Sequence, residues 1–103
     1  MVKRALIIQG GWDGHEPKLT SVRFAGLLEK NGYETEISDT LDCLADAEAL
    51  KQLDLIVACW TMGEIDHRYV QNLSAAVGEG VGLVGCHGGM CDSFRQDTEW
   101  QFI

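Results

Sequence analysis

Two continuous apolar runs constrain the fold of this chain more than any other feature. One run is Ala5–Ile8 and the other is Leu55–Cys59. A strand that is apolar at every position, rather than at alternate positions, is buried on both of its faces. Parallel sheets are typically buried on both faces, and their strands are joined by crossover connections that usually contain a helix. The two runs therefore predict an α/β fold with helices on both sides of a parallel sheet.

Strand-like and helix-like patterns alternate along the whole chain. Apolar residues at helical spacing predict a helix at 17–30, with a buried stripe from Leu19 to Leu28, and another at 67–77, capped by Asp66. Less regular patterns predict a short helix within 39–52, capped by Asp39 or Thr40, and a helical segment over 90–103. Strands are expected at 3–9, 33–38, 53–60 and 81–85, the second of them near an edge because its apolar residues alternate. This order predicts one domain with right-handed crossovers.

Composition narrows the class of protein and its partners. The chain has 103 residues, 46% of them hydrophobic, which suits one small globular domain. A net charge of -8 argues against nucleic acid and anionic membranes as partners, because both require a basic face. The apolar run near Met1 is too short for a membrane span or for the core of a signal peptide. Four cysteines without paired metal spacing predict free thiols in a cytoplasmic protein: Cys43, Cys59, Cys86 and Cys91.

A glycine-rich turn follows the last predicted strand. Gly85-Cys-His-Gly-Gly89 is too rich in glycine to continue a strand, and a helix-compatible segment comes after it. Such a strand–turn–helix would present Cys86 or His87 at the carboxyl edge of the sheet, where open α/β folds bind their ligands. A helix N-terminus would lower the pKa of the Cys86 thiol and make it a candidate nucleophile. The alternative is a small buried packing residue.

The loops after the first and third strands should reach the same edge. His15 and Glu16 are better placed than the adjacent His87 to assist Cys86 in acid–base or nucleophilic chemistry. Tryptophans in these loops suit stacking on a sugar ring, or simply cover the edge of the core. No cofactor is predicted. His15 and His87 could bind a divalent metal, and the alternative is that each has an ordinary hydrogen-bonding role. His67 is expected to be solvated. The two loops bring Trp12, Asp13, His15, Glu16, Trp60 and Glu64.

Four motifs in order resemble those of the ThuA, or trehalose-utilisation, family. They are residues 10–17, 38–41, 60–65, and 85–90 together with 93–95. The resemblance runs the whole length of the chain, but the family's domain is longer, which implies a single domain over 1–103 that is truncated at its carboxyl end. It also implies a flavodoxin-like three-layer α/β/α fold of the class I glutamine amidotransferase-like superfamily, with four parallel strands in this chain.

The resemblance implies a role in the utilisation of trehalose or another disaccharide, without defining a reaction. A sugar or sugar derivative would bind at the carboxyl edge, with Trp12, Asp13, Trp60 and Glu64 as substrate-binding residues and Cys86, His87, Glu16 and His15 as catalytic candidates. The first alternative is a cysteine hydrolase, since Cys86-His-Gly88 also resembles the turn of PfpI-type enzymes. However, ThuA members commonly carry a large apolar residue at the position of Cys86. The second alternative is a non-catalytic sensing or interaction module.

The carboxyl end carries apolar residues without a helix-stop signal. Trp100, Phe102 and Ile103 would expose apolar surface if they ended a free helix. We therefore expect either a fragment of a longer domain or a homo-oligomer formed through this end.

Overall fold

A computed structural model of the chain describes residues 3–11, 14, 16–61, 63–85, 93–94 and 97–101. The longest described helix has 14 residues, and none of the described helices combines the length and apolar character that crossing a membrane requires. The strands are β1 (Lys3–Gly11), β2 (Tyr33–Ser38), β3 (Leu55–Thr61) and β4 (Gly82–Gly85). The helices are α1 (Pro17–Lys30), the 3₁₀ helix η2 (Asp42–Ala45), α2 (Ala47–Lys51), α3 (His67–Gly78) and α4 (Thr98–Gln101).

The strands form one parallel sheet in the order β2-β1-β3-β4. In this register Ile7 lies between Ile37 of β2 and Val57 of β3, and Val57 in turn pairs with Val84 of β4. The predicted flavodoxin-like α/β fold is confirmed, and β2 is an edge strand as its alternating pattern indicated. All four strands point the same way, so their carboxyl ends meet at a single edge.

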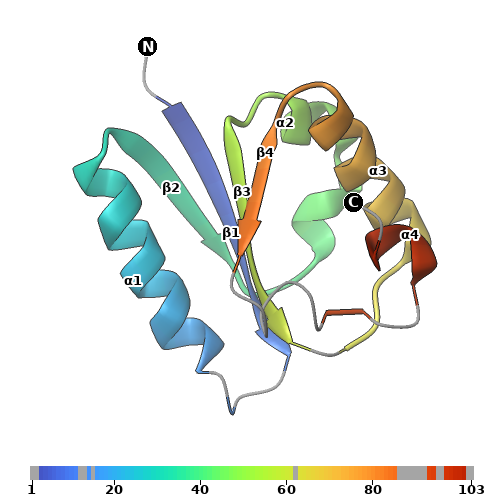
Figure 1. The fold of residues 1–103 in the computed structure, drawn as a ribbon, viewed down its shortest axis with the longest axis horizontal. Helices are drawn as coiled ribbons and strands as arrows, with labels where there is room; N and C mark the ends of the chain where they lie inside the picture. The colour runs from blue at the N-terminus through green and yellow to red at the C-terminus, as the bar shows by residue number, and fades with distance from the viewer. Residues whose placement is uncertain are drawn as a thin grey trace.

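Two apolar cores explain why β1 and β3 are continuously hydrophobic. Ile8 and Ile56 pack into a core with Leu73 of α3, and all three side chains are fully buried. Ile7 and Val57 point to the opposite face, where they pack with Ala25 of α1. Figure 1 shows α1 alone on one side of the sheet and α2, α3 and α4 together on the other. Each fully buried aliphatic side chain contributes roughly 1.5–3 kcal/mol to folding.

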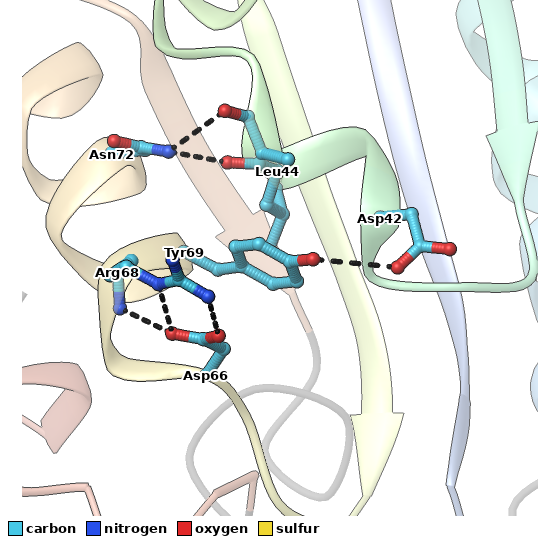
Figure 2. A network of polar contacts seen from close by, with 7 residues as sticks. Asp42, Leu44, Asp66, Arg68, Tyr69 and Asn72 are labelled. Carbon is cyan, nitrogen blue, oxygen red and sulfur yellow. Dashed lines mark hydrogen bonds and ion pairs between the residues drawn. The ribbon is translucent and has the colours of Figure 1, made fainter.

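Helix α3 is fixed at its amino end and along its side by polar contacts (Figure 2). The carboxylate of Asp66 accepts the backbone N–H of Arg68 at 2.9 Å, which confirms it as the cap of this helix. Hydrogen bonds from the Arg68 guanidinium and from that N–H lower the pKa of Asp66 to about 2. Further along the helix, Asn72 Nδ2 donates to the carbonyl oxygens of Leu44 and Ala45 at 2.8 and 3.3 Å, which ties α3 to η2.

Three sequence-based expectations about the helices need correction. Residues 39–52 form two short helices, η2 and α2, and the second is capped by Asp46, whose Oδ1 accepts the N–H of Ala49 at 3.1 Å. The predicted stripe of α1 is only partly buried, because Leu19 and Val22 are 46% and 55% exposed. The buried residues of α1 are instead Pro17, Ser21 and Ala25, and they form the side of the helix that faces the sheet.

The segment after β4 also differs from the predicted helix over 90–103. Ser93 and Phe94 are not helical, and Phe94 has a φ of +48°. Within the described residues, the helix of this segment is limited to α4, whose first turn is held by Asp97 through a 3.0 Å bond from the N–H of Trp100. The break lets Phe94 and Trp100 enter one core, where they are 0% and 5% exposed. Burial of two aromatic rings therefore outweighs helical continuity here.

Candidate functional site

The structure describes three of the eight side chains predicted to form the site. Glu16, Trp60 and Glu64 lie within the described residues. The other five predicted site residues are Trp12, Asp13, His15, Cys86 and His87, and all of them lie outside the described part of the chain. The geometry of the site is therefore built from the ends of β1 and β3 and from the residues that follow them.

The carboxyl ends of β1 and β3 pair through two glycines of β1. β1 extends to Gly11, two residues beyond the predicted strand end, and Gly10 and Gly11 pair with Trp60 and Thr61. Gly11 has a φ of +78°, and a Cβ added to it would lie 2.1 Å from the carbonyl oxygen of Thr61. Only glycine fits here, since it tolerates this φ and leaves room for the neighbouring backbone. Gly10 and Gly11, which follow the predicted strand 3–9, are thus the last residues of β1 that pair with β3.

Trp60 lies over the end of β1, where glycine leaves space for its ring. A Cβ added at Gly10 would lie 2.7 Å from the indole, and one added at Gly63 would lie 2.9 Å from its Nε1. The ring of Phe94 is 6.1 Å away, centroid to centroid, and the Trp60 carbonyl accepts a hydrogen bond from the Ser93 hydroxyl. Trp60 is half-buried and packs against the core on the α3 side. It therefore covers the edge of this core and keeps part of its surface exposed.

The two described carboxylates of the predicted site are both exposed. Glu16 precedes α1 in a left-handed conformation (φ +48°), and its carbonyl accepts the N–H of Thr20 at 2.9 Å while its carboxylate caps nothing. A shallow hollow of about 570 Å³ lies beside it, lined by Gln9, Pro17, Lys18, Leu19 and Val22 as well as Glu16. Glu64 lies between β3 and α3. Glu16 precedes the helix on one face of the sheet, and Trp60 packs on the other face. A ligand that contacts both residues must therefore pass over Gly10 and Gly11 at the end of β1.

A polar cluster between α3 and α4 was not predicted. His67 Nδ1 lies 2.9 Å from Asp97 Oδ2, and His67 Nε2 lies 3.4 Å from Glu99 Oε2. The Asp97 side chain is only 7% exposed, whereas that of His67 is 57% exposed. The signal in the sequence was Asp97-Thr-Glu99 ahead of Trp100, which is typical of a helix start. His67 is thus a partner of the carboxyl-terminal segment and not merely a solvated residue.

This cluster predicts a pH-dependent stability. The hydrogen bond with Asp97 raises the pKa of His67. Burial acts to raise the pKa of Asp97, but hydrogen bonds from His67 and from the Trp100 N–H outweigh it, and the pKa is lowered. The contribution of His67 to the free energy of unfolding should therefore be complete below its unfolded pKa of about 6.5. It should disappear as the pH rises through the higher pKa of the folded state. That of Asp97 should disappear as the pH falls through its lowered value.

The measurement is urea unfolding of the wild type and of His67→Ala from pH 5.5 to pH 9. We expect His67→Ala to be the less stable protein at pH 5.5 and the difference to shrink as the pH rises. Gln71→Ala, an exposed neutral change on the same helix, should show a difference that does not vary with pH. A His67→Ala difference that is the same at both ends of the range would contradict the ion pair.

The described residues show no clustered metal ligands, and one of their two thiols is made less reactive by burial. No group of three or more His, Cys, Asp or Glu side chains among them is arranged to hold a metal ion, and His15 and His87 lie outside this part of the chain. Cys43 is a half-buried free thiol, and Cys59 is buried. Burial raises the pKa of the Cys43 thiol, which makes it less reactive. Cys86 and Cys91 are outside the described residues.

Comparison with known proteins identifies the family. A family model described as trehalose utilisation (ThuA) matches residues 4–103. No curated protein and no solved structure matches the chain. The match spans nearly all of the sequence, and the parallel α/β sheet agrees with the fold that the motifs implied. The chain therefore belongs to the ThuA family, which is implicated in trehalose utilisation.

Proposed function

We propose that this chain binds trehalose, a related disaccharide or a derivative of one at the carboxyl edge of its sheet. The observation that carries the proposal is the family match over residues 4–103, because the family is described by trehalose utilisation. The proposed location of the binding site rests on a general rule, because open parallel α/β sheets bind their ligands outside the carboxyl ends of the strands. Gly11, the last residue of β1, is exposed at that edge.

The described side chains at this edge suit a neutral polyhydroxyl ligand. The exposed carboxylate of Glu16 can accept hydrogen bonds from sugar hydroxyls, and the hollow of about 570 Å³ beside it is within the size range of small-molecule sites. The exposed part of the Trp60 indole offers an apolar surface to a sugar ring. A net charge of -8 disfavours phosphorylated ligands. The proposal extends to Trp12, Asp13, His15, Cys86 and His87, which follow β1 and β4 in the sequence.

The test is an NMR titration of the ¹⁵N-labelled chain with trehalose, sucrose, maltose and their oxidised derivatives. We expect at least one of these sugars to shift the amide signals of Gln9, Glu16 and Trp60 at millimolar concentration. Glu16→Gln keeps the shape of the side chain but removes its charge, and should weaken binding about ten-fold, as the loss of a charge-assisted hydrogen bond does.

Glu34→Gln is the matched control, because Glu34 is an exposed glutamate near the start of β2, at the opposite edge of the sheet. This variant should bind the sugar as the wild type does. The proposal fails if no sugar shifts any amide at tens of millimolar. It also fails if the shifted amides cluster near Lys3 and Tyr33, or if the two variants weaken binding equally.

A further inference from the structure

Asn31 and Gly32 form the short turn that joins α1 to β2 (Figure 1). Both residues are exposed, and Gly32 has a φ of +87°. Asparagine is a thermolabile residue, because the backbone nitrogen of the next residue can attack its side-chain amide carbon. This attack is least hindered when glycine follows, since glycine has no Cβ. The Asn31–Gly32 pair therefore has the composition and the exposure of a site of chemical modification.

In the folded protein, both reacting groups of this pair are held by α1. Asn31 Nδ2 donates to the carbonyl oxygen of Leu27 at 2.8 Å. The Gly32 N–H donates to the carbonyl oxygen of Glu29 at 3.2 Å. The nitrogen that would attack and the amide that would leave thus each make a hydrogen bond to the helix. Attack by the Gly32 nitrogen therefore requires the last turn of α1 to open.

A side-chain hydrogen bond connects this turn to the sheet. Thr35 Oγ1 of β2 donates to Glu29 Oε1 at 2.8 Å. Glu29 is also the residue whose carbonyl oxygen accepts the Gly32 N–H. Helix ends open more often than the buried middle of an element, and each bond that restrains an end reduces its open fraction. The bond between Thr35 and Glu29 therefore helps to keep the turn closed.

The second asparagine of the sequence, Asn72, is in the opposite situation. It lies in the middle of α3 and is followed by Leu73, which is fully buried. Its Nδ2 donates to the carbonyl oxygens of Leu44 and Ala45. Opening the helix at this place would expose the core contacts of Leu73 as well as break helical hydrogen bonds. Asn72 is thus an internal reference for Asn31 within the same molecule.

We propose that Asn31 is a site of spontaneous deamidation that reacts only while the last turn of α1 is open. The Gly32 nitrogen forms a bond to Asn31 Cγ and loses its proton, the Cγ–Nδ2 bond breaks, and ammonia leaves with that proton. Water then opens the resulting five-membered imide at either of its carbonyl groups. The products are aspartate and isoaspartate at position 31.

Neither product can restore the end of α1. At neutral pH a carboxylate has no proton to donate to the Leu27 carbonyl oxygen, which now accepts the Asn31 amide. Its negative charge would also lie at the carboxyl end of a helix, where the helix dipole disfavours anions. Isoaspartate in addition lengthens the backbone between α1 and β2 by one carbon atom. Deamidation therefore loosens the turn that leads into the edge strand of the sheet.

The test is incubation of the folded chain at pH 8 and physiological temperature, followed by peptide mapping with mass spectrometry that separates aspartate from isoaspartate. We expect Asn31 to be converted to both products while Asn72 stays an amide. Conversion of Asn31 should be about five-fold faster or more in concentrated guanidinium chloride, because unfolding releases both hydrogen bonds of the pair. Thr35→Val should raise the rate in the folded protein about two-fold or more, since it removes the bond to Glu29.

Thr40→Val is the matched control, because Thr40 is exposed beyond the end of β2 and uses backbone atoms in its hydrogen bonds with Ser38. It should leave the rate at Asn31 unchanged, and circular dichroism verifies that both variants are folded. If Asn31 stays an amide as Asn72 does, Asn31 is not a deamidation site. Equal rates in the folded and the denatured chain, or equal rates in Thr35→Val and Thr40→Val, would show that the last turn of α1 does not control the reaction, and so would also overturn the proposal.

Discussion

Replacing Gly11 with alanine is expected to destabilise the protein by about 2–5 kcal/mol. The residue has a φ of +78°, which costs roughly 1–2 kcal/mol for a residue with a Cβ. The added Cβ would also lie 2.1 Å from the Thr61 carbonyl oxygen, and relieving such an overlap typically costs about 1–3 kcal/mol. Backbone atoms cannot rotate away as a flexible side chain would, so β1 and β3 must separate at this edge. The measurement is the free energy of unfolding in urea.

Gly26→Ala gives the matched comparison. Gly26 is exposed within α1, and a Cβ there would have no neighbour within 4 Å. Alanine favours the helix by roughly 0.5–1 kcal/mol over glycine, so this variant should be slightly more stable than the wild type. If Gly11→Ala is as stable as Gly26→Ala, the close approach between β1 and β3 is wrong. Because Gly11 is at the proposed sugar-binding edge, Gly11→Ala should also weaken sugar binding, whereas Gly26→Ala should not.

The fold was predictable because its determinants are local and periodic. Buried parallel strands are indicated by apolar residues that are adjacent in the sequence, at Ala5–Ile8 and Leu55–Cys59. Asp66 could be recognised as a cap because its hydrogen bond reaches only two residues along the chain. The helix periodicity of α1 predicted its position correctly, but not which of its apolar residues are covered. Coverage depends on which elements lie opposite, and Leu27 remains 58% exposed although it lines the same hollow as Val57 and Val84.

The polar and aromatic contacts near the carboxyl edge were less predictable, because they join residues that are far apart in the sequence. His67 and Asp97 are separated by 30 residues, and nothing in the sequence around either residue predicts that the two side chains meet. Trp60 was expected to face a ligand, yet its position also depends on the space left by Gly10 and Gly63 and on Phe94. The left-handed conformation of Phe94 is not encoded by a local preference, since phenylalanine rarely adopts it. Tertiary packing decides such positions.

The second large effect is expected at Phe94, where alanine should destabilise the protein by about 3–5 kcal/mol. The side chain is fully buried and contacts Trp100 edge-on at 4.8 Å between ring centroids, with Trp60 at 6.1 Å. Its removal leaves a cavity between the two indoles and takes away a contact that holds α4 in the core beside α3. The positive φ of Phe94 gives no compensating relief, because alanine is strained there too.

Phe24→Ala is the matched control for this prediction. Phe24 lies on α1 and is only half-buried, so its truncation should cost distinctly less than that of Phe94. The free energies of unfolding in urea give the comparison, and the emission of Trp60 and Trp100 should shift to longer wavelength in folded Phe94→Ala alone, as water reaches both indoles. If the two variants cost the same and leave the emission unchanged, Phe94 does not support Trp60. The carboxyl edge would then owe its shape to Gly10, Gly11 and Gly63 without help from the segment that follows β4.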